Sequence, residues 1–178
     1  YGPTECSDDV THHVARTAPE AGLLHMPIGR PIGNLRAYVL DEGLDPVGPG
    51  MAGELYIGGT GVCRGYLGRA DLTAERFLPD PYGAAGERMY RTGDRARRRS
   101  DGELVYLGRL DDQVKIRGHR IEPGEAEAAL LAEPGVRQAV VLAQGEGGAR
   151  RLVAYVVGEG LSGPDLRERL RRRLPDWL

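Results

Sequence analysis

A hydroxyl and a carboxylate stand side by side near the start of the sequence, in the turn Tyr-Gly-Pro-Thr-Glu at residues 1–5. Thr4 can donate a hydrogen bond to a phosphate oxygen, and Glu5 supplies the hard oxygen ligand that a divalent cation prefers. A Gly-Pro turn that carries a solvated glutamate is the simpler interpretation, and the turn taken alone favours it. The pair therefore indicates phosphate and metal chemistry only if other parts of the sequence agree.

A further carboxylate, Asp94, follows a glycine in the stretch Tyr-Arg-Thr-Gly-Asp at residues 90–94. A carboxylate in such a turn can accept two hydrogen bonds from the diol of a ribose, as acidic residues do in other nucleotide sites. An aspartate that only caps a turn is the alternative, and for an isolated motif it is the commoner case. Asp94 is thus a candidate ribose ligand.

Charged residues are densest at residues 108–121, where Lys115 is the single lysine of the chain. A solvated charged hairpin explains this composition as well as a binding site does.

The glycine-rich stretch at residues 53–61 resembles a phosphate-binding loop, but no helix follows it to hold a phosphate. We predict close backbone packing there rather than a dinucleotide-binding loop.

The elements that must position these residues change in character near residue 110. Before it we expect turns and strands, with a short helix; after it we expect an alternating strand around Val114 and Ile116, followed by helix, two strands and helix. In the first part we expect strands at 35–40, 54–57 and 103–107 and a helix at 71–77. In the second part we expect a helix at 124–132, strands at 138–143 and 152–157, and a helix from about 162. Leu166, Leu170 and Leu174 lie on the expected buried stripe of this last helix. The sequence therefore predicts an α+β fold of two parts, 1–110 and 111–178.

The composition excludes several classes of protein. Lysine and arginine number 24 against 26 acidic residues, for a net charge of −2, whereas a nucleic-acid binder needs a surplus of positive charge. No apolar run approaches the roughly 20 residues of a membrane span. Cys6 and Cys63 lie far apart, which favours a reducing, cytoplasmic setting. Because the sequence opens without methionine, we expect a piece of a longer protein.

Four motifs in order give the sequence a recognisable pattern. Residues 1–5, 53–67, 90–94 and 108–127 match the fifth to eighth core motifs of one family, and residues 174–178 look like the start of the ninth. The sequence resembles the adenylation domains of nonribosomal peptide synthetases, within the adenylate-forming ligases. The resemblance implies a strand-rich, distorted barrel-like part of the large subdomain, followed by a small α+β lid subdomain.

The resemblance also implies roles for individual residues. Residues of the first turn would serve ATP and its cation, while the later motifs would bind the nucleoside and move the lid. Tyr1 would lie against adenine, Thr4 would touch the α-phosphate, and Glu5 would hold Mg²⁺. Asp94 would bind the ribose hydroxyls, with Tyr106 and Arg109 nearby. Asp111 would be the hinge, Gly118 would border the pantetheine channel, and Asp8 and Asp9 would lie at the edge of the substrate pocket.

The activity that this resemblance implies is the joining of an amino acid to AMP. ATP and Mg²⁺ would be the cofactors, and the acyl group would pass to the phosphopantetheine thiol of a peptidyl carrier protein. Two alternatives stay open: an acyl-CoA or aryl-acid ligase of the same superfamily, and a non-catalytic lid that docks a carrier. The family's phosphate loop and its tenth-motif lysine have no counterpart in these 178 residues, so we expect the chain alone to form no adenylate.

Overall fold

The computed structural model describes residues 1–16, 26–145 and 149–178. Backbone contacts divide the chain into two compact units, Tyr1–Asp111 and Asp112–Leu178, and each unit is described by itself. This division falls one residue beyond the boundary expected from the sequence.

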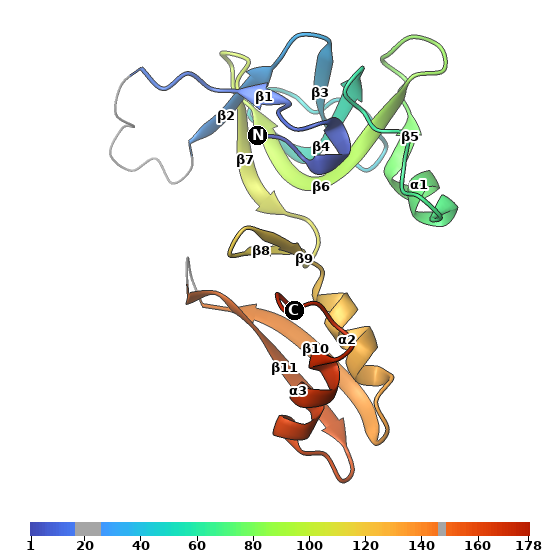
Figure 1. Cartoon of the computed structure of the whole chain (residues 1–178). Helices are drawn as coiled ribbons and strands as arrows, with labels where there is room; N and C mark the ends of the chain where they lie inside the picture. The colour runs from blue at the N-terminus through green and yellow to red at the C-terminus, as the bar shows by residue number, and fades with distance from the viewer. Residues whose placement is uncertain (17–25, 146–148) are drawn as a thin grey trace. The chain divides into compact units, whose positions relative to one another are not determined.

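One antiparallel sheet dominates the first unit, with strand order β1-β2-β7-β6-β4-β3 and β5 paired to β6. Figure 1 shows that the sheet curls around the long, curved strand β6. Register shifts between Glu54 and Tyr56 and between Arg95 and Ala96 accompany this curvature, since bulges increase local bend and twist. The strands are β1 (Thr11–His12), β2 (Pro27–Pro31), β3 (Leu35–Leu40), β4 (Ala52–Gly59), β5 (Phe77–Pro79), β6 (Arg88–Arg98) and β7 (Leu104–Arg109).

The two faces of this sheet bury separate apolar clusters. Leu55 and Ile57 of β4 point into the larger cluster together with Tyr90 of β6. Tyr56 and Met89, one position along each strand, belong to a smaller cluster with Leu40. Alternate residues of one strand thus serve opposite faces, as the pleat requires.

The strands predicted at 35–40, 54–57 and 103–107 are confirmed, the last two with longer or shifted bounds. The predicted helix is α1 (Ala70–Arg76), and it ends one residue early because Phe77 starts β5. The sequence did not predict β1, β2, β5 or β6. In β6 the buried residues include the polar Thr92 and Asp94, which conceal the hydrophobic alternation that marks a strand.

The second unit is a small α+β fold, so the predicted fold class is confirmed. Its hairpin β8–β9 is followed by α2, the hairpin β10–β11 and α3. The bounds of these elements are β8 (Val114–Ile116), β9 (His119–Ile121), α2 (Pro123–Leu131), β10 (Val136–Gln144), β11 (Arg151–Gly158) and α3 (Gly163–Arg171). Leu166 is buried as predicted, and Leu170 and Leu174 pack on the core formed by α2 and β10. Leu174 does so from a turn beyond the helix end, where its amide bonds the Leu170 carbonyl.

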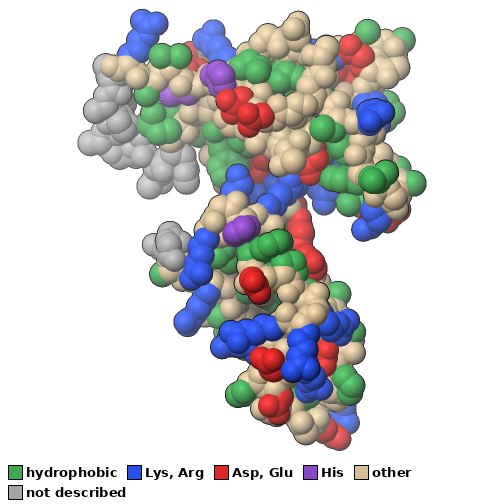
Figure 2. All heavy atoms as spheres, viewed as in Figure 1, with side chains coloured by type: hydrophobic (Ala, Val, Ile, Leu, Met, Phe, Trp, Pro, Cys, Tyr) green, Lys and Arg blue, Asp and Glu red, His purple; other side chains and the backbone are tan. Residues whose placement is uncertain are grey.

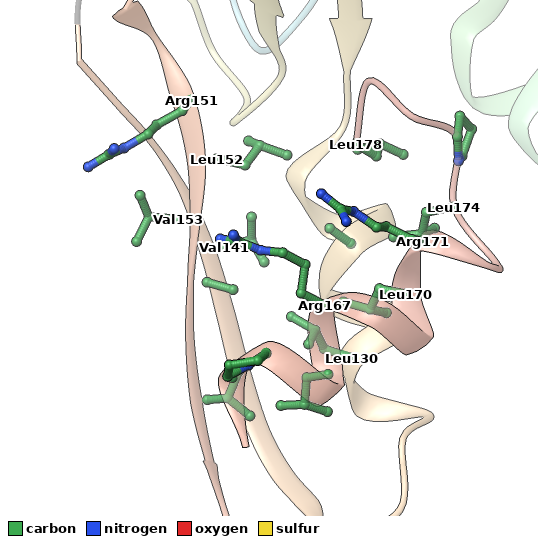
Figure 3. Close-up of a pocket in the computed structure, with 17 residues that line it drawn as sticks. Leu130, Val141, Arg151, Leu152, Val153, Arg167, Leu170, Arg171, Leu174 and Leu178 are labelled. Atoms are coloured by element: carbon green, nitrogen blue, oxygen red, sulfur yellow. The ribbon is translucent and has the colours of Figure 1, made fainter. Parts of the chain in front are cut away.

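The second unit also contains a hollow of about 730 Å³ lined by α2, α3 and the β10–β11 hairpin (Figure 3). Its lining is mainly apolar and includes Arg151, Arg167 and Arg171. On the surface of this unit, Figure 2 shows basic side chains interleaved with acidic ones. Among the described residues, no helix has the length and hydropathy needed to cross a membrane.

Candidate nucleotide-binding site

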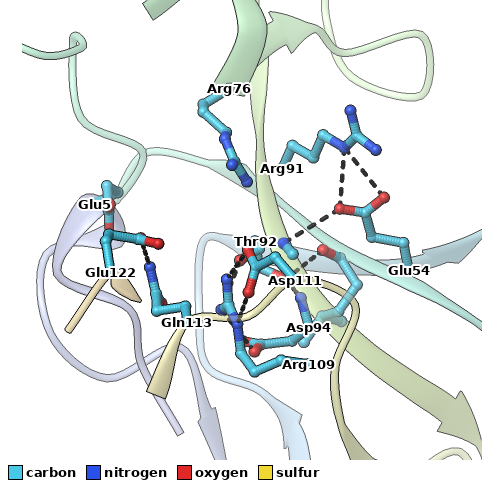
Figure 4. A network of polar contacts seen from close by, with 12 residues as sticks. Glu5, Glu54, Arg76, Arg91, Thr92, Asp94, Arg109, Asp111, Gln113 and Glu122 are labelled. Carbon is cyan, nitrogen blue, oxygen red and sulfur yellow. Dashed lines mark hydrogen bonds and ion pairs between the residues drawn. The ribbon is translucent and has the colours of Figure 1, made fainter. Parts of the chain in front are cut away.

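Asp94 belongs to a polar network in the first unit that Arg109 joins together (Figure 4). The Tyr1 hydroxyl donates to Asp94 Oδ2, across 93 positions of sequence. On the other oxygen, Arg109 Nη1 donates to Oδ1 at 2.8 Å. Asp94 is 6% exposed, so these two partners satisfy a carboxylate that is almost removed from water.

Local backbone geometry aims Asp94 at these partners. The Thr92 hydroxyl donates to the Leu55 carbonyl of β4 at 2.7 Å and accepts the Asp94 amide at 3.0 Å. Gly93 between them has φ +73°, a left-handed conformation that glycine adopts without steric cost. A Cβ at Gly93 would lie 2.6 Å from Arg109 Nη2, so the glycine also makes room for the guanidinium.

Arg109 joins Asp94 to Asp111, the last residue of the first unit. Its Nε and Nη2 donate to the two carboxylate oxygens of Asp111 at 2.7 Å and 2.5 Å, a bidentate pair. Nη1 also donates to the Thr92 carbonyl at 2.9 Å. The expected ribose ligand and the expected hinge residue therefore share one arginine.

Backbone hydrogen bonds fix the position of Tyr1. The Tyr1 carbonyl accepts the amides of Val10 and Thr11 at 2.8 Å and 3.0 Å, which brings the two ends of the segment 1–11 together. Burial raises the pKa of the Tyr1 hydroxyl far above its usual value, and the charge of Asp94 raises it further. The hydroxyl therefore stays protonated, and can donate to Asp94, beyond the pH at which an ordinary tyrosine ionises.

Thr4 and Glu5 lie together in a single 3-10 turn, Thr4–Cys6. Thr4 is exposed, whereas Glu5 is 9% exposed and its Oε1 accepts the Tyr66 hydroxyl at 2.7 Å. Burial raises the pKa of the Tyr66 hydroxyl, and hydrogen bonds to Tyr90 and Glu5 add to the shift. The turn thus presents an accessible hydroxyl beside a buried, oriented carboxylate.

Glu5 is compatible with a Mg²⁺ ion that also binds phosphate. In the described residues no three His, Cys, Asp or Glu side chains gather as a metal site. Mg²⁺ does not require such a cage, since it keeps several waters and takes one or two protein carboxylates together with substrate phosphates. A single buried carboxylate next to a hydroxyl fits that pattern.

The structure places the other expected site residues in three separate regions. Asp8 and Asp9 are exposed. Asp9 Oδ2 is 3.0 Å from His12 Nε2, and the side chains of Asp9 and His12 are each 58% exposed. Tyr106 lies in β7 opposite Ala96. Gly118 lies in the second unit, in the β8–β9 turn with φ +84°, and no atom would contact a Cβ there within 4 Å.

Sequence reasoning assigned no role to Thr92 or Tyr66, although both side chains touch expected site residues. Thr92 carries a local signal, because a hydroxyl two residues before a carboxylate can bond its backbone amide. Tyr66 carries none, since it meets Glu5 across 61 positions of sequence.

Comparisons with known proteins identify the family of the chain. A family model described as AMP-binding enzyme matches residues 1–67. The chain is 55% identical over 185 residues to phosphinothricin tripeptide synthetase PhsB of Streptomyces viridochromogenes, and 53% identical over 181 residues to a dimodular nonribosomal peptide synthase of Bacillus subtilis. Both alignments cover the whole chain, which spans 15% and 7% of those relatives.

Solved structures show the same fold. PA1221, described as an NRPS protein containing adenylation and PCP domains, superposes with a TM-score of 0.81 at 33% identity, over 99% of this chain and 35% of that one. The fused adenylation–PCP di-domain NpsA-ThdA from Klebsiella oxytoca gives a TM-score of 0.69 at 36% identity, over 86% and 28%. The chain therefore belongs to the AMP-binding enzymes, among which its sequence and fold match the adenylation domains of nonribosomal peptide synthetases.

Proposed function

We propose that the chain is part of an enzyme that activates an amino acid with ATP and passes it to the phosphopantetheine thiol of a peptidyl carrier protein. The observation that carries this proposal is the buried Asp94 carboxylate, bonded to the Tyr1 hydroxyl and connected through Arg109 to Asp111 at the end of the unit. The relatives described as peptide synthases, and the adenylation–PCP structures, support the same activity.

In the first half-reaction a carboxylate oxygen of the amino acid attacks the α-phosphorus of ATP. The bond from that phosphorus to the bridging oxygen breaks, and pyrophosphate leaves. Thr4 donates to an α-phosphate oxygen, while Asp94 accepts from the ribose hydroxyls and fixes the nucleoside. Glu5 would hold Mg²⁺, which would offset the charge of the phosphates.

In the second half-reaction the carrier thiolate attacks the acyl carbonyl, and AMP leaves. Asp111 is the hinge that changes the setting of the lid, residues 112–178, between the two steps. Gly118 borders the pantetheine channel, Tyr1, Tyr106 and Arg109 flank the nucleoside, and Asp8 and Asp9 edge the amino-acid pocket. A cytoplasmic setting belongs to the proposal, and the free thiols of Cys6 and Cys63 accord with it.

The test is ATP–pyrophosphate exchange by the full protein that carries this chain, with a panel of amino acids. Exchange that depends on one or a few amino acids supports the proposal. Asp94→Ala is expected to raise the Michaelis constant for ATP by roughly tenfold to a hundredfold, because a charged acceptor is lost. Asp101→Ala, which removes a half-exposed carboxylate in the same unit, is the matched control. Stimulation only by carboxylic acids without an α-amino group would replace the proposal with the acyl-CoA or aryl-acid ligase.

A further inference from the structure

The carboxylate of Glu5 is contacted by a residue from a motif that the proposed function leaves without a role. Tyr66 lies in the 53–67 motif, and its hydroxyl donates to Glu5 Oε1 at 2.7 Å. The same motif also holds the Glu5 backbone, because the Cys63 amide donates to the Glu5 carbonyl at 2.9 Å. Backbone and side chain of Glu5 are thus fixed by one segment.

Tyr66 is itself held rigidly. Its amide donates to Thr73 Oγ1 at 2.9 Å, and its ring packs edge-on against Phe77 with centroids 5.4 Å apart. Gly65 precedes it with φ +136°, and a Cβ there would lie 2.8 Å from Thr73 Oγ1. The hydroxyl therefore reaches Glu5 from a position that α1 and β5 determine.

Orientation matters more for this carboxylate than for one in a large metal cage. No cluster of three potential ligands surrounds it in the described part of the chain. A cation held by one protein carboxylate and by phosphate oxygens depends on the direction of that carboxylate, and groups that bond a metal ligand typically set metal affinity through its orientation.

We propose that Tyr66 is a positioning residue that orients the Glu5 carboxylate for the divalent cation accompanying ATP. The inference rests on the proposed function, because it takes Glu5 as the cation ligand. Under this proposal the 53–67 motif contributes to cation binding, because the close backbone packing at Gly65 positions the Tyr66 hydroxyl that orients the Glu5 carboxylate.

The experiment measures Mn²⁺ binding to the full protein with ATP present, by electron paramagnetic resonance. Tyr66→Phe keeps the ring on Phe77 and removes only the hydroxyl, and we expect about 10- to 100-fold weaker Mn²⁺ binding. Excess Mg²⁺ should restore most of the exchange rate of this variant. AMP affinity without a cation should stay as in the parent protein. Tyr82→Phe is the control, because it removes a hydroxyl that donates to the Leu44 carbonyl at 2.7 Å.

The remaining outcomes separate the inference from the proposed function. Parent-like Mn²⁺ affinity in Tyr66→Phe, alongside lost affinity in Glu5→Gln, overturns the inference and leaves the proposed role of Glu5 standing. Weaker AMP binding by Tyr66→Phe without a cation would instead indicate a structural role, and also overturns it. Parent-like Mn²⁺ affinity in Glu5→Gln removes the cation role of Glu5 and the inference with it.

Discussion

Two buried aspartates of the first unit, Asp94 and Asp80, are each bound by an arginine and a tyrosine. Asp80 accepts Arg36 Nη2 at 3.0 Å and the Tyr38 hydroxyl at 3.2 Å, and its side chain has no exposed surface. Asp94 accepts Arg109 Nη1 at 2.8 Å and the Tyr1 hydroxyl. By residue type, and by the burial of the aspartate side chain, the two clusters are nearly the same.

Their surroundings differ. Asp80 accepts the Tyr82 amide at 2.9 Å, and Arg36 of β3 also pairs with Glu87, so the cluster ties the loop between β5 and β6 to β3. The Asp94 cluster instead continues through Arg109 to Asp111 at the end of the unit. A buried ion-pair cluster therefore does not identify a site; the connections of its members do.

The largest effect is expected where the Asp94 cluster meets the proposed hinge. Proline fixes φ near −65° and removes a backbone donor, so Asp111→Pro should trap one setting of the lid and also remove the bidentate partner of Arg109. One half-reaction should fall by orders of magnitude while the other survives, as measured by pyrophosphate exchange and by thioester formation on the carrier. Equal loss of both in a folded protein, or loss of neither, would contradict a hinge at this residue.

Asp80→Ala should show the structural nature of the other cluster. It leaves the Tyr82 amide without its acceptor and removes one partner of Arg36, and should lower the free energy of unfolding by about 2–4 kcal/mol. This range starts lower than the usual one for a fully buried pair, because Arg36 is 36% exposed. Urea denaturation gives the value, and a change below about 0.5 kcal/mol would show that the loop does not depend on Asp80.

A smaller effect is expected from adding one methyl group beside each cluster. Gly93→Ala should displace Arg109 and strain a left-handed residue, which weakens AMP binding about threefold to tenfold. Gly83→Ala places a Cβ 2.9 Å from Arg36 Nη2 and should lower stability without changing AMP affinity. AMP titration of the two variants side by side makes the comparison, and a similar loss of affinity in both would remove the distinction between the clusters.

The secondary structure could be predicted from the sequence only in part. Local patterns predicted β3, β4, α2 and the leucine stripe of α3, because apolar spacing alone defines their buried faces. Strand β6 was missed because its buried positions include Thr92 and Asp94, and polar residues at core positions break the pattern that reveals a strand.

The site residues were likewise predicted only in part. Motif resemblance selected Tyr1, Asp94 and Arg109, and the structure joins them in one network. The contact of Tyr66 with Glu5 depends on how α1, β5 and the first turn pack, and no local spacing encodes a pair 61 residues apart. Pairings of that kind come only from the fold.

The most direct test of the account is the equilibrium dissociation constant for AMP, measured by calorimetry on Asp94→Ala and Asp80→Ala in the full protein. The account predicts roughly tenfold to hundredfold weaker binding for Asp94→Ala, because a charged hydrogen-bond acceptor is lost. Asp80→Ala should keep the parent value while it remains folded. Parent-like affinity in Asp94→Ala, or equal weakening in both variants, would contradict a nucleotide-binding role for the Asp94 cluster.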